Sequence, residues 1–255
     1  MKLFFSLLIA LMSTSWNLSA TPSSEFWTIC TTSVYDTGLG HLDNDYFFTI
    51  FDAHGERPIL SPDVGFELGI FSWKDWKSEA GVDFLGGTDA PLFFNFSIAI
   101  EEDKLFPHAP SFKVGIFDIG TSRSVYPRTD RNTVDIIFGK TLPKPVEGSL
   151  YIGVFSGSRA IGRIRQGIMF AYEKFFSPAK DENDKEYFKW RFCADYASGN
   201  NVYGGGGFGL SYSYNPDISV LMGPTWFISN KFNGEWKWSV QISYDFPVFK
   251  PPKAK

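Results

Sequence analysis

The sequence predicts an all-β protein, an antiparallel up-and-down transmembrane β-barrel of about 12 strands. Three observations carry this prediction. Apolar and polar residues alternate in segment after segment, several of these segments are long, and the chain begins with an export signal. A tilted strand of about ten residues is long enough to cross a bilayer, whereas soluble strands are usually nearer five or six residues.

The first 20 residues have the pattern of a cleaved secretory signal peptide. Lys2 gives a basic start, residues 3–12 form a short apolar run, and a polar stretch ends at the small residue Ala20. The apolar run is too short to cross a bilayer as a helix. The mature chain is then a single β-barrel domain, residues 21–255, in which residues 247–255 form a basic C-terminal tail.

The composition favours alternating strands and argues against two other classes of protein. Aromatic residues make up 18% of the chain, which is unlike a disordered sequence, and the net charge of −4 with both signs mixed is unlike a nucleic-acid-binding protein. The two cysteines, Cys30 and Cys193, are too few for a disulfide framework. Two separate buried thiols are favoured, although export allows a single bridge between them.

The alternation is clearest in residues 236–246. Trp236, Trp238 and every second residue after them are apolar, whereas the residues between them are polar. One face of this strand is therefore apolar and the other is polar. An even number of strands is usual in bacterial barrels. Of about thirteen candidate strands we therefore expect twelve to span the membrane, and residues 25–35 are the weakest candidate. The same pattern recurs in residues 25–35, 46–51, 92–101, 112–116, 134–138, 150–154, 164–173, 188–196, 208–215 and 218–226.

Gly, Asn, Asp and Pro between these segments supply the backbone angles that tight reversals need. If the last strand ends on the periplasmic side, alternate connections are fixed. Residues 143–147 and 215–217 then form periplasmic turns, and residues 177–186 form an unusually long one. The connections on the outside are those at residues 57, 121–131, 158–162, 198–201 and 230–233.

The polar faces of the strands supply the candidate functional residues, because in a closed barrel these faces line the lumen. A constriction of charged side chains would tune the passage of small polar or charged solutes. An internal ion-pair network that only stabilises the wall is an equal alternative. The predicted lumen-facing residues are Asp83, Lys113, Arg165, Glu173, Lys189, Arg191, Asp195, Lys237, Gln241 and Asp245.

The residues predict no catalytic, cofactor or metal site. His41, His54 and His108 fall in predicted loops, without the nucleophile that a barrel hydrolase needs on the same strand face. Residues 181–186 lack the glycine and spacing of a calcium loop, so a solvated turn is predicted. The glycine run at residues 204–209 precedes no Lys-Ser/Thr pair and is therefore not a phosphate loop. We expect it to let a neighbouring side chain or strand approach closely, or to bend the barrel wall.

Several stretches resemble a group of uncharacterised bacterial outer-membrane, porin-like β-barrel proteins. This resemblance implies a barrel in the outer membrane and no particular activity or catalytic residues. The chain departs from such barrels in continuing beyond Phe246, where the last strand is expected to close. The stretches are WTICTTS (27–33), HLDNDY (41–46), EAGVDF (79–84), PLFFN (91–95), GKTLP (139–143), ADYASGNN (194–201) and QISYDF (241–246).

Three functions are compatible with these patterns. The first is a narrow porin-like channel or passive transporter, with outer-membrane lipid and small solutes as its partners. The second is a plugged structural or adhesive barrel whose external loops touch partners. The third is a secreted soluble β-sandwich that binds carbohydrate through its aromatic residues. The sequence identifies neither a solute nor an oligomeric state.

Overall fold

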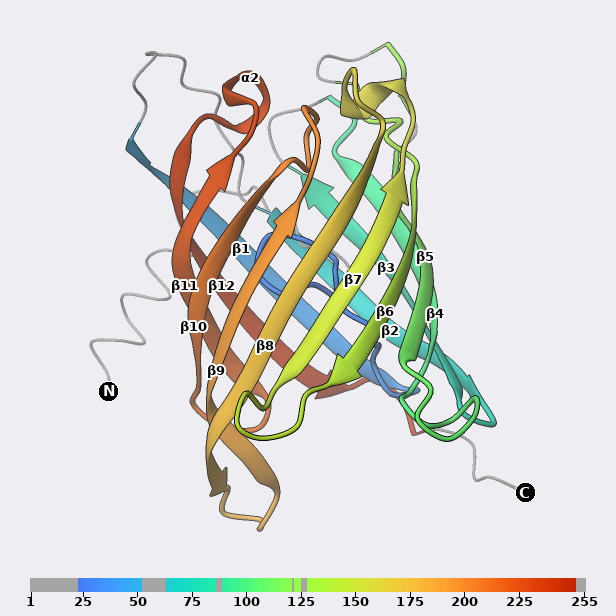
Figure 1. Ribbon diagram of the computed structural model, residues 1–255, viewed down its shortest axis with the longest axis vertical. Coiled ribbons are helices and arrows are strands. Elements are labelled where there is room, and N and C mark those ends of the chain that lie inside the picture. Colours follow the sequence, from blue (N-terminus) through green and yellow to red (C-terminus); the bar gives the residue numbers. More distant parts are fainter. Residues whose placement is uncertain (1–22, 52–62, 86–88, 121, 125–127, 251–255) are drawn as a thin grey trace.

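A computed structural model describes residues 23–51, 63–85, 89–120, 122–124 and 128–250 of the chain (Figure 1). Twelve antiparallel strands form one closed barrel, in which every strand pairs with its sequence neighbours and β1 pairs with β12. The predicted fold class and strand number are therefore confirmed. The alternative of a β-sandwich is wrong, because a single sheet closes on itself.

The strands follow one another in chain order around the barrel. The described residues also include a 3₁₀ turn at Arg159–Ile161 and a short helix, α2, at Asn230–Asn233. None of the described helices is long and apolar enough to cross a membrane. The strands are β1 (Leu39–Phe51), β2 (Asp63–Trp73), β3 (Trp76–Leu85), β4 (Leu92–Ile100), β5 (Ser111–Gly120), β6 (Thr133–Thr141), β7 (Ser149–Ser156), β8 (Gln166–Lys180), β9 (Glu186–Ala197), β10 (Gly205–Ser213), β11 (Ile218–Phe227) and β12 (Trp236–Pro247).

The two-residue period of the sequence sorts side chains between the inside and the outside of the barrel. On β6, Ile137 points inward and is fully buried, whereas its neighbour Ile136 points outward and is 42% exposed. The register aligns these rows between strands, so that Ile136 lies opposite Val154 of β7. The outward rows together form an apolar belt, which includes Leu92, Phe94, Phe96, Val134, Ile136, Phe138, Leu150, Ile152, Val154, Ile168, Phe170, Phe208, Leu210, Trp236 and Trp238.

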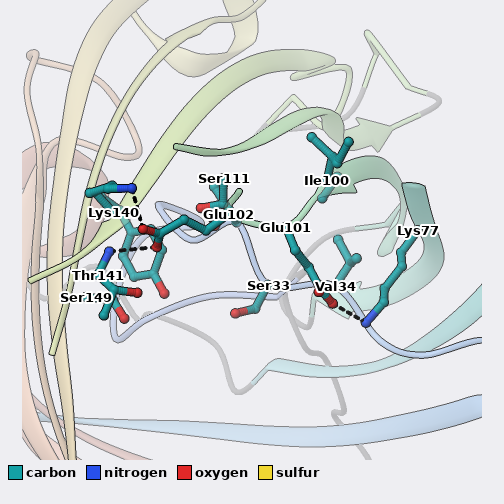
Figure 2. Close-up of a pocket in the computed structure, with 13 residues that line it drawn as sticks. Ser33, Val34, Lys77, Ile100, Glu101, Glu102, Ser111, Lys140, Thr141 and Ser149 are labelled. Atoms are coloured by element: carbon teal, nitrogen blue, oxygen red, sulfur yellow. Dashed lines mark hydrogen bonds and ion pairs between the residues drawn. The ribbon is translucent and has the colours of Figure 1, made fainter. Parts of the chain in front are cut away.

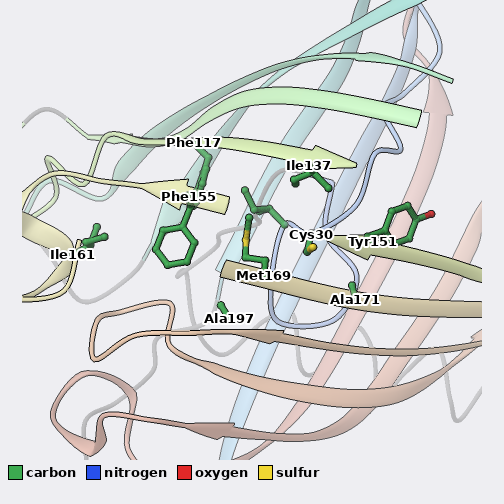
Figure 3. Close-up of a cluster of buried hydrophobic side chains, with 10 residues drawn as sticks. Cys30, Phe117, Ile137, Tyr151, Phe155, Ile161, Met169, Ala171 and Ala197 are labelled. Carbon is green, nitrogen blue, oxygen red and sulfur yellow. The ribbon is translucent and has the colours of Figure 1, made fainter. Parts of the chain in front are cut away.

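The buried hydrophobic core lies inside the barrel, against the wall of β5 to β9 (Figure 3). Inward side chains of neighbouring strands, such as Ile137, Tyr151 and Met169, form most of it. Two members, Ile29 and Cys30, come from the chain before β1. The interior is therefore packed from both the wall and the N-terminal segment.

The N-terminal segment, residues 23–37, is not a barrel strand. Residues 25–35 are the weakest of the thirteen candidate strands, and they form none: the segment pairs with no strand and lies inside the barrel (Figure 1). The predicted signal peptide lies outside the described residues.

The hairpin of β8 and β9 corrects the prediction of a long turn at residues 177–186. Pairing between the two strands continues to Lys180 and Glu186, which leaves only residues 181–185 as the turn. The hairpin therefore projects beyond the barrel at the end where β12 also ends (Figure 1). The turns at residues 143–147 and 215–217 lie at this same end, as predicted.

The chain after β12 remains attached to the barrel as far as it is described. The backbone N–H groups of Val248 and Phe249 donate to the carbonyl oxygen of Gly38, at 2.8 and 3.3 Å. These contacts hold the beginning of the predicted tail against the chain that enters β1. Residues 251–255 of that tail lie outside the described part of the chain.

We expect Ile137→Ala to lower the free energy of unfolding by about 2–5 kcal/mol, because it leaves a cavity in a packed interior. Ile136→Ala on the same strand is the matched control and should cost clearly less, since its side chain encloses no cavity. Equilibrium urea unfolding of the folded barrel measures both. Equal losses for the two variants would contradict the inward packing of this row.

Candidate functional site

The N-terminal segment, residues 23–37, occupies the barrel lumen and enters and leaves it at the same end. Ser23, Ser24 and Tyr35 all line one cavity beside the β10–β11 turn. Between them the chain reaches inward to Trp27, whose indole N–H donates to the carbonyl oxygen of Tyr203 at 2.9 Å. Tyr203 belongs to the β9–β10 loop at the opposite end. The segment thus runs into the barrel, reverses direction near Trp27 and returns to the same end.

Asp195 of β9 holds the innermost part of this segment. One oxygen, Oδ2, accepts the backbone N–H groups of Phe26, Trp27 and Thr28 at 3.0, 2.8 and 2.6 Å. Asp195 is 5% exposed, so these bonds form away from water. Three consecutive N–H groups that converge on one carboxylate satisfy donors that would otherwise be buried without partners, and hydrogen bonds to a charged acceptor are the stronger kind.

Glu79 of β3 holds both limbs of the segment at once. Its Oε2 accepts the Ser23 hydroxyl at 2.9 Å and the backbone N–H of Tyr35 at 3.1 Å. The hydroxyl of Ser97 on β4 donates to the other oxygen, Oε1, at 2.9 Å. Glu79 therefore fixes the place where the outgoing and returning limbs lie side by side.

The carbonyl groups of the segment are bound by donors from the wall. Gln241 Nε2 donates to the Phe26 oxygen at 2.7 Å, and Lys113 Nζ donates to the Ile29 oxygen at 3.3 Å. Arg191 Nη2 donates to the Glu25 oxygen at 3.3 Å. The barrel wall thus replaces a neighbouring strand as the hydrogen-bonding partner of this backbone.

The ring of Phe26 fits against a part of β10 that has no side chains on its inner face. A Cβ atom at Gly207 would lie 2.2 Å from the ring, and one at Gly209 would lie 2.3 Å from it. Phe26 itself is 2% exposed. The glycine run thus admits the ring of another segment, as predicted from its sequence.

Most of the predicted lumen-facing residues lie on the inner face of the barrel. Arg191 and Asp245 are partly exposed there, and Arg191 Nη1 lies 3.6 Å from both Glu25 Oε2 and Glu173 Oε2. Several of the set bind the N-terminal segment or each other, so they meet a segment that the prediction did not place inside. The buried members are Asp83, Lys113, Glu173, Asp195, Lys237 and Gln241.

Arg165 and Lys189 are placed differently from the prediction, and both side chains are exposed. Arg165 precedes β8 and lies in the β7–β8 loop, because β8 begins only at Gln166. Lys189 is on the same face of β9 as the inward residue Arg191. It lies, however, beyond Trp190, the last residue of β9 that pairs with β10, and so belongs to the projecting hairpin. Neither residue belongs to the enclosed lumen.

His41 corrects the prediction that all three histidines lie in loops. It is on β1, where its Nδ1 lies 2.6 Å from Asp245 Oδ1 of β12 and its ring stacks on Tyr35 at 4.7 Å. His108 does lie in a turn, between β4 and β5, and is exposed. His54 is outside the described residues. The pairing of His41 ties the exit of the N-terminal segment to the seam where the barrel closes.

A polar network links residues of β5 and of two loops at the opposite end of the barrel from the segment's entry. Asp118 Oδ2 accepts from Arg131 Nη1 at 2.8 Å and from the Tyr203 hydroxyl at 2.9 Å. In the same β5–β6 loop, Arg128 makes two hydrogen bonds to Asp130, at 3.0 and 2.7 Å. These bonds hold the pKa of the Asp130 carboxyl below its usual range. Through Asp118, the β5–β6 and β9–β10 loops are therefore linked to each other.

Two cavities flank the N-terminal segment at the end where it enters and leaves. One, of about 270 Å³, lies between Thr32–Val34 and the rim, where Lys140 bonds Glu102 and Lys77 bonds Glu101 (Figure 2). The other, of about 230 Å³, contains His41 and is lined by serines of β10 to β12. The segment thus separates two polar vestibules.

Cys30 and Cys193 are both buried and unpaired, which confirms the prediction of two separate thiols.

The carboxylate of Asp181 stabilises its own turn, since Oδ1 accepts the backbone N–H groups of Asn183 and Lys185, each at 2.8 Å. Among the described residues, no group of three or more His, Cys, Asp or Glu side chains could hold a metal ion.

Sequence reasoning missed Glu79 and Phe26 as functional residues. Glu79 has the same inward parity on β3 as Asp83, four positions away, so the two-residue period could have placed it in the lumen. Phe26 looked like one apolar residue of a weak strand. The sequence signal that pointed toward Phe26 was the glycine run of β10, which requires a close neighbour without naming it.

No protein-family model matches this chain, and no curated protein matches it. Among solved structures, the chain is similar to a KdgM porin, with 9% identity, 82% of this chain and 99% of that chain covered, and a TM-score of 0.46. A KdgM porin in complex with disordered oligogalacturonate gives 9% identity, 82% and 99% coverage and a TM-score of 0.47. A NanC porin gives 11% identity, 83% and 100% coverage and a TM-score of 0.42.

These similar structures are porins, the class that the sequence motifs resemble. At such identities and TM-scores, the likeness carries no argument about what this chain binds. Its function has to be argued from its own residues.

We expect Asp195→Ala to loosen the segment and to expose Cys30, whose side chain is fully buried. In a Cys193→Ala background, maleimide labelling of Cys30 should become at least about tenfold faster, because each lost bond to the carboxylate contributes about 1.5–3 kcal/mol. Glu182→Ala, in the exposed β8–β9 turn, is the control. Unchanged labelling in a folded barrel would show that Asp195 does not hold the segment.

Proposed function

We propose that this protein is an outer-membrane β-barrel and a narrow channel for small solutes, closed at rest by its own N-terminal segment, residues 23–37. The observation that carries the proposal is that this segment reverses direction inside the barrel, with both limbs at the end of the barrel where β12 ends. The predicted signal peptide would deliver the chain across the inner membrane.

The outward apolar belt supports a location in lipid. Large hydrophobic side chains on successive strands are about two-fifths to one-half exposed, and no described part of the chain covers them. Soluble monomers rarely expose continuous apolar patches of this extent. Closure of the sheet also leaves no strand edge unpaired, which a bilayer requires of a spanning β structure.

The way in which the segment is held supports a removable plug. Its backbone is bound mainly by side chains, including Asp195, Glu79, Gln241 and Lys113, and by no strand ladder. Because both limbs lie at one end, the segment can withdraw without threading through the barrel. Two cavities already flank it there, so withdrawal joins these spaces at that end, and it also removes the contact of Trp27 with the β9–β10 loop at the opposite end.

A plugged structural or adhesive barrel is the second candidate. The network of Asp118, Arg131 and Tyr203 at the opposite end favours it, because a cross-linked loop surface presents a fixed shape to a partner. In that case the N-terminal segment is a permanent filling of the lumen. Conductance separates the two candidates.

The location in lipid predicts a large effect of charge on the outer face. Ile152→Lys, in the middle of β7, should weaken folding into lipid vesicles by about 2–4 kcal/mol, because a charge at the bilayer midplane is costly. Glu182→Lys, on the exposed β8–β9 turn, should change little. Folding into vesicles is followed by heat-modifiable gel migration. If both variants fold equally well, the outer face does not meet lipid.

The closed state predicts an increase in conductance when the segment is removed. The full chain should be silent in planar bilayers, whereas a chain without residues 23–34 should give stepwise currents, because the lumen loses its filling. This deletion keeps the rim contacts of Tyr35 with His41 and of Asp36 with Lys77. A folded deletion variant that stays silent at every applied voltage would favour the plugged structural barrel.

A further inference from the structure

Four carboxylates form a continuous acidic area on the inner wall of β1 to β3. Asp45 of β1 lies directly opposite Asp63 of β2, and Asp83 of β3 lies opposite Gly65, beside them. Glu67 follows on β2, one inward position beyond Gly65. Like charges opposite each other on neighbouring strands destabilise a sheet, so their retention here needs a reason other than stability of the wall.

Each of these four side chains has an oxygen without a hydrogen-bond partner. These oxygens are Asp45 Oδ1, Asp63 Oδ1, Glu67 Oε2 and Asp83 Oδ1. Glu67 is 1% exposed and Asp83 is 2% exposed, so water does not compensate them from outside the barrel. A carboxylate that is buried without a donor is costly as an anion, so these groups are disfavoured in the charged form while the lumen is filled. In an open, hydrated lumen they ionise, and a cation is then the ligand that they attract.

The wall holds two of these carboxylates in place. Asn95 of β4 donates from Nδ2 to Asp83 Oδ2 and, at 3.4 Å, to Glu67 Oε1. The Glu67 carboxylate also folds flat over Gly81, where a Cβ atom would lie only 2.1 Å from it. Asn95 thus engages one oxygen of each group, whereas Glu67 Oε2 and Asp83 Oδ1 have no hydrogen-bond partner.

The basic side chains nearest to this area have other partners as well. Lys113 and Arg191 bind the N-terminal segment, and Arg131 forms an ion pair with Asp118. The charge of Arg131 also acts on Asp63, and that of Lys113 acts on Glu67. No three-ligand metal geometry exists among the described residues, so this area concentrates mobile cations instead of chelating one.

We infer that the acidic area of Asp45, Asp63, Glu67 and Asp83 selects cations over anions when the lumen is open. This inference rests on the proposed channel function and specifies its substrate class, small inorganic or organic cations. A cleft lined by one sign of charge raises the local concentration of counter-ions about tenfold or more. Cations thus populate the passage and anions are repelled from it.

The test is the reversal potential of the chain without residues 23–34 in a potassium chloride gradient. We expect potassium to be favoured over chloride by about tenfold. The combined variant Asp45→Asn, Asp63→Asn, Glu67→Gln and Asp83→Asn should bring that ratio close to one. The matched comparison removes two charges at a time: Glu67→Gln with Asp83→Asn should lower the ratio, whereas Glu182→Gln with Asp184→Asn, on the outer turn, should not.

The outcomes separate this inference from the proposed function. Currents without cation preference, or a preference that the four substitutions leave unchanged, would overturn the selectivity and leave the channel standing. A folded barrel without any current would overturn both. If the deletion prevents folding, the same measurement is made on full-length Asp195→Ala, in which the segment is loosened and the acidic area is intact.

Discussion

The arrangement of the lumen depends on one carboxylate oxygen. Asp195 Oδ2 accepts three consecutive backbone N–H groups, from residues 26–28, in a place closed to water. Without it, these donors would be buried without partners, and the turn of the segment around Trp27 would lose its support. The position of Phe26 in the glycine slot of β10 and the contact of Trp27 with Tyr203 both follow from this anchor.

The barrel therefore has two kinds of inner wall. The side formed by β5 to β9 is largely apolar and packs Ile29 and Cys30 of the N-terminal segment. The side formed by β1 to β3 is acidic and keeps several oxygens without partners. A narrow barrel that served only as a scaffold would gain stability from apolar residues on both sides, whereas a polar side suits a passage that is filled at one time and hydrated at another.

The sequence supported the fold more strongly than the site. Alternation on β6, β7, β10 and β12 was explicit, and the chain's length and turn residues limited the strand number to about a dozen. Lumen candidates on long, regular strands, such as Asp195 and Gln241, were found by parity alone. The two-residue period gave the wrong position for Arg165 and Lys189. Both lie beyond the rim of the barrel, where no neighbouring strand encloses a lumen for a side chain to face.

The amino-acid sequence by itself determined the fold class, most of the strands and which face of each of these is apolar, because all of them depend on a two-residue period that neighbouring residues carry. It also recorded, in the glycines of β10, that something must approach that wall closely. Only the tertiary structure decided that Phe26 is what approaches and that the segment lies inside the barrel. The reason is physical: Phe26 and Asp195 are separated by 169 positions in the chain, and no local pattern encodes a contact that exists only after the sheet has closed.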